Sequence, residues 1–241
     1  MKCGLVHKIL CLQLLAWIGV VNGFSTKTPD VVSTLLKEKD AVDVEKAFAT
    51  SSFPISPEDL IARVKEVLSP QIAVGTKDGG NCLADNFEFC AAVIGPLGKE
   101  EYLEALGSFK LEDSFDIYQN SFGFTVSPVQ PNRVYWFNQQ VATMTAPFMN
   151  VKTISKDEII LPPQCLHMDF DDSGKVIEFG FYTVDRRYGN TDGLGGAFGY
   201  FKGAGMKIPI PEFNGYKPSF RLRMFHLIGK LGNFLSNKKK S

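Results

Sequence analysis

The chain has 241 residues, of which 44% are hydrophobic and 22% charged, and 26 basic residues balance 26 acidic ones. This length and composition are typical of one globular domain with short extensions, and they are sufficient to bury a core. The charge is unevenly distributed, because seven Lys and Arg residues and no acid follow Phe213, which leaves the rest of the chain net acidic. An acidic body with a basic tail argues against nucleic acid as the main ligand.

Residues 1–23 have the pattern of a signal peptide. Lys2 and Lys8 precede an apolar run over 9–21, and residues 21–23 place short side chains at the cleavage positions. The run is too short and wrongly flanked for a stable membrane span. A buried N-terminal helix is the alternative interpretation.

Residues 24–55 form a short lead-in that is either transit-like or helical. Cleavage after Gly23 places Phe24 first, followed by a hydroxyl-rich, basic stretch over 25–29. This start resembles the two-part presequence of algae whose plastids lie behind extra membranes, although acids at Asp30 and Glu38 depart from it. We expect a plastid protein that travels through the secretory pathway, with secretion or residence in an endomembrane lumen as the alternative.

The main domain, residues 56–210, begins with helices. Ser56 is suited to cap a helix and Pro57 to its first turn, and apolar residues then recur at helical spacing as far as residue 68. The pattern predicts a helix over 57–68 and another over 98–109. Between them, 83–90 regains order after a glycine-rich break.

After residue 120 the hydrophobic period changes from 3.6 to 2. Strands are predicted over 122–126, 133–145, 159–161, 166–170 and 176–185, with hairpin-turn residues at 172–174. Helices followed by a run of strands indicate the α+β class. We therefore expect a cone-shaped, curved antiparallel sheet with the N-terminal helices packed on one face.

Four stretches carry a resemblance to a known superfamily. They are the loop and helix start over 93–103, the hairpin FDDSGKV over 170–176, the DRR triplet at 185–187 and the GNTDGLGG run over 189–196. Together they resemble the nuclear-transport-factor-2-like, or SnoaL-like, proteins, in particular those of algal type. The resemblance covers Pro57 to Pro209. It implies a small-molecule pocket, but the fold hosts isomerases, cyclases, dehydratases and non-catalytic carriers, so the reaction is not implied.

At the positions where the best-understood members of that superfamily carry catalytic carboxyl groups, this sequence has no acidic residue. The resemblance places Leu166 at the neutral-acid position and Ala91 near the base position, and neither side chain moves a proton. If the register shifted by one residue, His167 would take the place of Leu166. Alternation along the strand instead turns His167 outward, to a surface or second-layer position.

Asp185 and His167 are the candidate catalytic residues. Period 2 puts Asp185 on the same face as Phe179 and Phe181, where desolvation would raise its pKa and suit it to general acid-base work. A salt bridge to a neighbouring arginine or a turn cap is the alternative. His167 is the only histidine between the leader and the basic tail, and histidine carries protons near neutral pH.

The ligand-binding candidates are mainly aromatic. They are Arg133, Tyr135, Trp136, Tyr182 and Asn190. A cation with aromatic walls suits a planar or anionic organic ligand, although adjacent strand residues point to opposite faces and such aromatics also fill cores. Asn190 belongs to a rim loop whose glycines bend the backbone. With no metal-ligand spacing and no complete nucleotide motif, we expect no metal and no cofactor.

The tail, residues 211–241, is basic and amphipathic. Its apolar residues over 218–241 fall at helical spacing, which suits either a membrane surface or docking on the domain. The sequence thus predicts a protein that binds a small hydrophobic molecule, accessory to plastid or secondary-metabolite biosynthesis. The alternative is an isomerase, cyclase or dehydratase that uses Asp185. A homodimer is also among the expectations.

Overall fold

The computed structural model describes residues 42–91 and 94–207, together with residues 220, 223, 224, 227 and 228 of the tail. The predicted signal peptide, most of the lead-in and most of the basic tail therefore lie outside the described residues. All of the elements below belong to one compact unit that begins at Asp43. Within the described part of the chain, no helix has the length and apolar character needed to cross a membrane.

Helices and strands are interleaved in the first half of the domain. In chain order the elements are α3 (Val44–Ala49), α4 (Pro57–Val67), β1 (Leu83–Phe89), β2 (Leu97–Gly98), α5 (Lys99–Phe109), a 3-10 turn (Leu111–Asp113), β3 (Phe115–Val126), β4 (Arg133–Met144), β5 (Ile159–Ile160), β6 (Gln164–Phe170), β7 (Val176–Thr183) and α6 (Gly196–Gly203).

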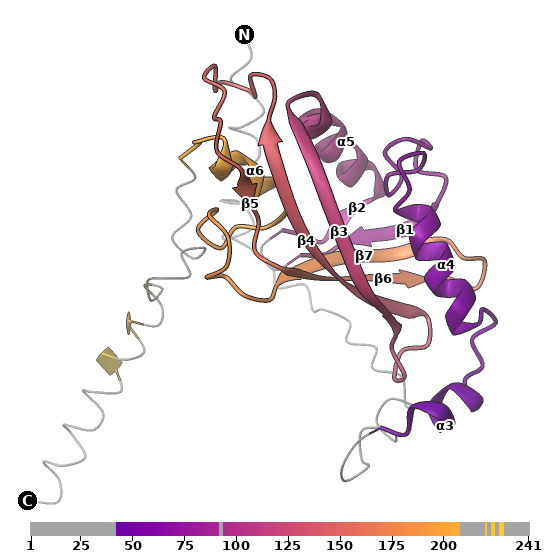
Figure 1. Ribbon diagram of the computed structural model, residues 1–241. Coiled ribbons are helices and arrows are strands. Elements are labelled where there is room, and N and C mark those ends of the chain that lie inside the picture. The colour runs from indigo at the N-terminus through magenta and orange to yellow at the C-terminus, as the bar shows by residue number, and fades with distance from the viewer. Residues whose placement is uncertain (1–41, 92–93, 208–219, 221–222, 225–226, 229–241) are drawn as a thin grey trace, which may run out of the picture. The chain divides into compact units, whose positions relative to one another are not determined.

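The strands form one sheet in the order β2-β1-β7-β6-β4-β3, with β5 paired to β4. Every pair is antiparallel except β1 with β7, which is parallel. Figure 1 shows the long β3 and β4 running steeply across β6 and β7, so the sheet is strongly twisted. The expected α+β class with a curved sheet and helices packed on it is confirmed.

The structure corrects three boundaries. Residues 83–90 contain strand β1, which comes before α5, so helices and strands are interleaved. The strand predicted over 122–126 begins at Phe115, because its first half pairs with the far end of β4. The last long strand ends at Thr183 and not at Asp185, because the chain enters a turn there.

Local chemistry explains the confirmed elements. The Ser56 hydroxyl accepts the Asp59 N–H and caps α4, whose buried stripe is Leu60, Val64 and Val67. The β6–β7 turn closes because one Asp171 carboxylate oxygen accepts the N–H groups of residues 173 and 175. Such a turn is typical of the Asp-Ser-Gly sequence.

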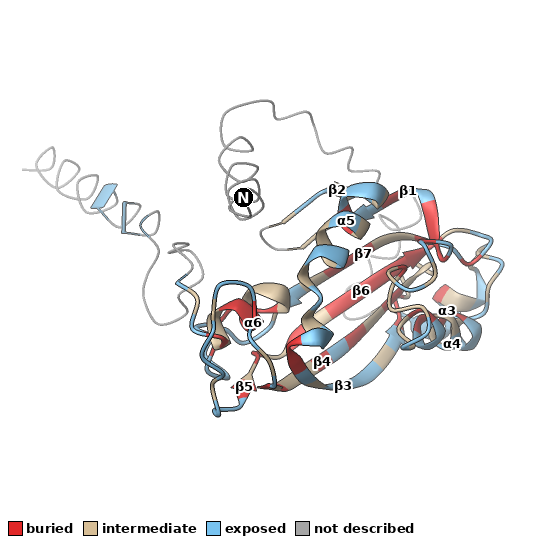
Figure 2. Ribbon diagram, turned by 90° about the horizontal axis from the view of Figure 1, so that it is seen from above, coloured by how far each residue is buried: buried red, intermediate tan, exposed pale blue. Residues whose placement is uncertain are grey.

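The two faces of the sheet are unlike each other. The inner face, which carries Trp136, Leu166 and Phe179, packs against α4 and α5 in the larger hydrophobic cluster. A smaller cluster joins α6 to β5 and the adjoining ends of β3 and β4. The outer face carries the alternate residues, among them Tyr135 and His167. Figure 2 shows β6 buried along most of its length, whereas β3 is largely exposed.

Candidate functional site

The inner face of the central strands is uncharged. Strand pairing places Trp136 opposite Leu166, and Asn138 opposite Gln164, on β4 and β6. Its residues on β4, β6 and β7 are Val134, Trp136, Asn138, Gln140, Ala142, Met144, Gln164, Leu166, Met168, Phe170, Phe179, Phe181 and Thr183. None of these side chains is ionisable. This face therefore suits an apolar occupant.

Aromatic rings form a row along this face. The Trp136 ring lies nearly parallel to Phe124 at 5.8 Å and to Phe179 at 6.3 Å between centroids. Tyr102, from α5, meets Phe179 edge-on at 6.5 Å. The helix thereby places one phenol over the row of rings that the strands provide.

Four polar atoms buried on this face have no hydrogen-bond partner among the residues that the structure describes. They are Tyr102 Oη, Trp136 Nε1, Asn138 Oδ1 and Gln164 Nε2, and no other fully buried side-chain nitrogen or oxygen of the described residues lacks one. The four residues are between 0% and 4% exposed. Leaving a buried polar atom unpaired costs about 1–3 kcal/mol, so native proteins keep few of them. Four on one apolar face mark a surface that a hydrogen-bonding occupant would complete.

Two buried ionisable groups of this region, Tyr102 and Cys82, stay neutral near pH 7, while Lys65 Nζ, from α4, lies 5.3 Å from the centroid of the Phe124 ring. Burial, with a smaller contribution from Cys82, raises the pKa of the Tyr102 phenol above its ordinary value. Burial also raises the pKa of the Cys82 thiol to about 12, with the charge of Asp78 as the next cause. The inner-face side chains of β4, β6 and β7, together with these two groups, therefore present apolar surface and neutral hydrogen-bonding atoms.

The glycine-rich loop covers one end of the inner face. A Cβ atom on Gly195 would lie 2.0 Å from Gln164 Nε2 and 3.1 Å from Thr183 Oγ1. Gly196, at φ +54°, lies against the Phe181 ring, where a Cβ would come within 2.6 Å. These glycines are close-approach positions, which explains why the loop can lie directly on the amide of Gln164.

On the outer face, four charged or titratable side chains form a cluster, which we call the outer-face cluster: Arg133, His167, Asp169 and Glu178. Arg133 donates to both carboxylate oxygens of Asp169, at 2.5 and 2.7 Å, and to Glu178 at 3.2 Å. His167 Nε2 lies 2.7 Å from the same Glu178 oxygen. The aligned register of β4, β6 and β7 brings the members together.

The pKa shifts in the outer-face cluster follow from its contacts. The hydrogen bond from His167 lowers the pKa of Glu178, with the charges of His167 and Arg133 adding to it against the effect of burial. Burial raises the pKa of Asp169 despite its pairing with Arg133. Burial works to lower the pKa of Arg133, but Asp169 and Tyr135 more than offset this and raise it. Every charge in the cluster is thus paired.

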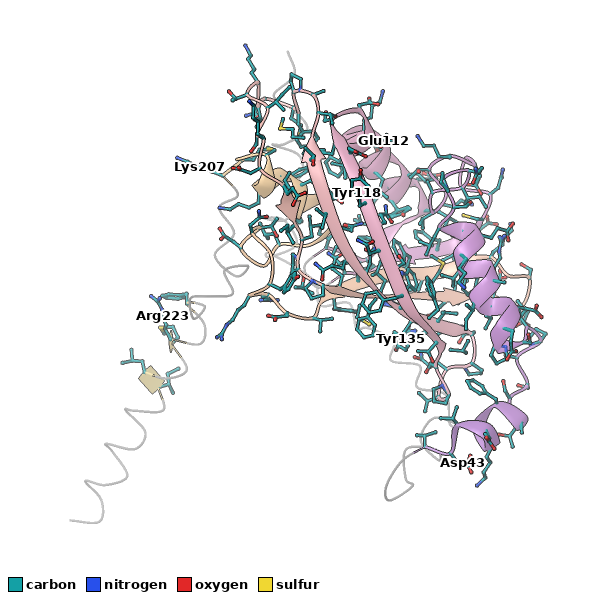
Figure 3. All side chains as sticks on the ribbon, viewed as in Figure 1. Asp43, Glu112, Tyr118, Tyr135, Lys207 and Arg223 are labelled. Carbon is teal, nitrogen blue, oxygen red and sulfur yellow. The ribbon has the colours of Figure 1, made fainter. Side chains whose placement is uncertain are left out.

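Four of the seven residues predicted for the site come together, but on the outer face. The His167 ring lies between Tyr135, at 6.2 Å, and Tyr182, at 6.0 Å, and Arg133 donates to the Tyr135 hydroxyl. Figure 3 labels Tyr135 on β4. His167 faces outward, as alternation predicts, yet it is only 2% exposed. Because Leu166 lies on the inner face, His167 does not take its place there.

The other three predicted residues lie apart. Trp136 is on the inner face. Asp185 is exposed beyond the end of β7, where its carboxylate accepts the Arg187 N–H at 2.9 Å, so it does not share the face of Phe179. Asn190 bonds to the backbone of residues 158 and 160 and ties the glycine-rich loop to β5.

Sequence reasoning missed the residues that complete both surfaces. Asp169 lies opposite Arg133 across β4 and β6, and Glu178 lies opposite Asp169 across β6 and β7, an arrangement that becomes visible only when the strand register is known. Asn138 and Gln164 are uncharged amides in apolar strands. Without the strand register, nothing in the sequence indicates that the two side chains are partners. Of the described residues, no three His, Cys, Asp or Glu side chains are arranged to hold a metal ion.

Comparison with known proteins gives structural likenesses only. No protein-family model and no curated protein sequence matches the chain. AclR, a proposed hydroxylase from Streptomyces galilaeus, is similar over 77% of this chain and 99% of its own, with 15% identity and a TM-score of 0.44. A proposed SnoaL-like polyketide cyclase from Jannaschia sp. CCS1 is similar over 56% of this chain and 89% of its own, with 17% identity and a TM-score of 0.40.

An LEH-like epoxide hydrolase from M. tuberculosis is similar over 52% of this chain and 83% of its own, at 10% identity and a TM-score of 0.39. The Jannaschia protein is one of three neighbours whose names include the term SnoaL-like. At such identities no residue role is transferred to this chain. The algal type stays a prediction.

Proposed function

We propose that this protein binds a small, mainly apolar organic molecule on the inner face of its sheet, as an accessory protein of biosynthesis. One observation carries the proposal: four buried polar atoms stand without partners on an uncharged face lined with aromatic rings. Small-molecule sites in proteins have this composition, with apolar walls and a few fixed polar groups. A bound molecule would supply the missing hydrogen bonds.

The catalytic alternative has weaker support. An isomerase, cyclase or dehydratase needs a group that exchanges protons beside the substrate. Asp185 is exposed and caps a turn, and His167 is buried against Glu178 on the opposite face from the unpaired atoms. Tyr102, the phenol on the inner face, has a raised pKa and keeps its proton at neutral pH. Binding without chemistry accounts for these positions.

Trp136 provides the test. The chain has two tryptophans, so Trp17→Phe in the full chain leaves Trp136 as the only one. Titration with N-phenyl-1-naphthylamine, a neutral apolar dye, is expected to quench Trp136 emission saturably as energy passes to the bound dye. Tyr118→Ala, at an exposed position of β3 labelled in Figure 3, serves as the control and should leave the titration unchanged. Emission that stays constant up to the solubility limit of the dye would refute the proposal.

The tail is proposed to hold the protein at an anionic membrane surface. Phe220, Met224, Leu227 and Ile228 are helical and between 41% and 72% exposed, at the spacing of one helix face. The sequence around them is basic and lacks acids. Apolar and basic residues combined in this way favour the interface of an anionic bilayer.

Vesicle flotation tests the tail. The full chain should float with vesicles of equal parts phosphatidylglycerol and phosphatidylcholine, and less with phosphatidylcholine alone. Leu227→Ser with Ile228→Ser should abolish flotation, whereas Tyr118→Ser with Phe122→Ser, which removes equally exposed apolar side chains from β3, should not. Equal recovery of both variants would exclude the tail as the anchor.

Plastid targeting through the secretory pathway is likewise a proposal, supported by the pattern of residues 1–29. A fluorescent protein fused after residue 55 and expressed in an alga with secondary plastids should accumulate in the plastid. Accumulation in the medium or in the endomembrane lumen would favour the alternative destinations.

A further inference from the structure

The polar groups of the inner face are concentrated at one place, between the two hydrophobic clusters. Along β4, Trp136 belongs to the larger cluster and Ala142 to the smaller, and Asn138 lies between them. Along the second strand, Leu166 belongs to the larger cluster and Leu161, just before β6, to the smaller, with Gln164 between them. The two amides therefore form a polar seam between the two clusters, with Gln140 next to Asn138 along the same face of β4.

Asn138 and Gln164 are direct cross-strand partners and are 4% and 3% exposed. Asn138 leaves an acceptor, Oδ1, without a partner, and Gln164 leaves a donor, Nε2. Side chains opposite each other on one face of an antiparallel pair lie about 5 Å apart at their Cβ atoms. The seam thus presents one unpaired acceptor and one unpaired donor as close neighbours.

We propose that this amide pair recognises an uncharged group that presents a donor and an acceptor side by side, such as a carboxamide, a lactam or a hydroxy-ketone. The proposal rests on the proposed function, because it names the chemistry of the molecule bound at the same face. The Asn138 oxygen would accept from the donor of that group, and the Gln164 N–H would donate to its acceptor. A complementary pair of this kind is bidentate, which fixes orientation as well as affinity.

Charge on the ligand is disfavoured at this seam. No cation lies among the inner-face residues of β4, β6 and β7 to balance a carboxylate, and the Asn138 oxygen would face it acceptor to acceptor. Burying an unpaired charge costs far more than burying a neutral amide. A neutral amide and the carboxylate of the same shape should therefore differ in affinity for this seam only because of their charge and their hydrogen-bond donors.

Gly195 positions the pair. Its backbone lies against Gln164 Nε2 so closely that a Cβ atom would come within 2.0 Å. The Gly195 backbone therefore covers one side of the Gln164 amide and limits the positions open to that side chain.

Three isosteric probes test the inference in the full chain carrying Trp17→Phe, with Trp136 emission as the readout. They are 2-naphthamide, which has the donor and acceptor, 2-naphthoate, which has two acceptors and a charge, and naphthalene, which has neither. The amide is expected to bind about tenfold or more tighter than the carboxylate, because a site built for hydrogen bonds rejects a mismatched analogue strongly.

In Asn138→Leu with Gln164→Leu, the amide should lose its advantage over naphthalene, while naphthalene itself still binds. Asn120→Leu, which removes an exposed amide from β3, is the matched control and should keep the advantage. Equal affinities of the amide and the carboxylate for the original chain would overturn the inference, whether or not the double variant folds. An amide advantage that survives in the double variant would also overturn it. Failure of all three probes to bind would instead refute the proposed function.

Discussion

The two faces of the sheet treat buried polar groups in opposite ways. On the outer face, Arg133, His167, Asp169 and Glu178 satisfy one another across three strands. On the inner face, four uncharged polar atoms are buried without hydrogen-bond partners among the described residues. The charged side chains of the outer-face cluster are each paired with another member of the cluster. The inner face, without any charge, has four hydrogen bonds still to make.

This contrast suggests a criterion: polar groups that are paired within the protein serve its structure, and buried polar groups that remain unpaired are candidates for binding. Sequence reasoning weights charge and histidine, because these groups perform most chemistry. In this fold the charged set is a closed network that holds β4, β6 and β7 in register, and the neutral amides and ring hydroxyl are what a ligand would meet. The predictions below test that division, beginning with the change of largest expected effect.

Breaking the outer-face cluster should be costly. Asp169→Ala removes the bidentate partner of Arg133, whose side chain is 17% exposed, and leaves a mostly buried cation with only the longer contacts to Glu178 and to the Tyr135 hydroxyl. The free energy of unfolding is expected to fall by about 3 kcal/mol, the usual result of removing one partner from a buried pair. Urea denaturation at neutral pH measures it. Asp172→Ala, exposed in the β6–β7 turn, is the control and should cost less than about 0.5 kcal/mol.

A loss below about 1 kcal/mol for Asp169→Ala would show that the network does not hold the sheet. The same variant should bind N-phenyl-1-naphthylamine with unchanged affinity wherever it is folded, because the dye meets the other face. A parallel loss of stability and of dye affinity would instead couple the two faces.

Gly195→Ala tests the inner face through its loop. The backbone angle of Gly195, φ −108°, suits any residue, so the cost comes from the added methyl meeting the Gln164 amide. We expect a loss of about 2 kcal/mol, typical of overpacking. In a Gln164→Ala background the same change should cost much less, because the obstructing amide is gone. Gly107→Ala is the control, since nothing lies near it on α5 and alanine favours helix.

Equal costs of Gly195→Ala in the two backgrounds would show that Gly195 does not act through Gln164. Denaturation of all four chains forms a double-mutant cycle, and the coupling between the two positions is its result.

The acid limb of stability reports on Glu178. In the folded chain the pKa of Glu178 lies below its ordinary value of 4.5, mainly because His167 donates to it. The unfolded chain therefore binds the proton first as the pH falls, so this contribution to stability is present above pH 4.5 and is lost as the pH falls through the folded pKa. Asp169, whose pKa is raised by burial, acts in the opposite direction.

Glu178→Gln should flatten the acid limb relative to the original chain, because glutamine does not titrate. Denaturation midpoints measured at intervals from neutral pH down to about pH 3 give the comparison. Glu112→Gln provides the comparison: the pKa of Glu112 is also lowered, by Lys77, but both side chains are more than half exposed, so this change should flatten the acid limb less than Glu178→Gln does. If Glu178→Gln keeps the slope of the original chain, the hydrogen bond with His167 does not set the pKa of that carboxylate.

Much of the fold was predictable, because local signals agree with the final structure. The cap at Ser56, the period of α4 and the Asp-Ser-Gly turn act over a few residues and are visible in the sequence. Strand β1 was not assigned, because its pairing with β7 is parallel and joins residues 90 to 93 positions apart in the chain, a contact that no local pattern encodes.

The candidate site was predictable only in part, for the same reason. Alternation correctly separated Trp136 from Tyr135 and turned His167 away from Leu166. It did not reveal that Asn138 faces Gln164, because register across strands depends on the whole sheet. Asp185 was placed on the apolar face by extending the period two residues too far, past the point where a turn bond to Arg187 ends the strand.

Two buried tyrosines give the smallest and most direct test of the division between paired and unpaired groups. Tyr102 and Tyr200 are 1% and 2% exposed, but only the Tyr200 hydroxyl has a partner, Gln140 Oε1 at 3.0 Å. Tyr200→Phe should cost about 1 kcal/mol, because it removes a hydrogen bond and leaves the Gln140 oxygen without it. Tyr102→Phe should be neutral or stabilising in thermal unfolding, since it removes an unpaired hydroxyl, and it should weaken only those ligands that bond to the phenol. If Tyr102→Phe destabilises the ligand-free chain as much as Tyr200→Phe does, the Tyr102 hydroxyl is already paired within the protein, and the inner face has one fewer bond to offer.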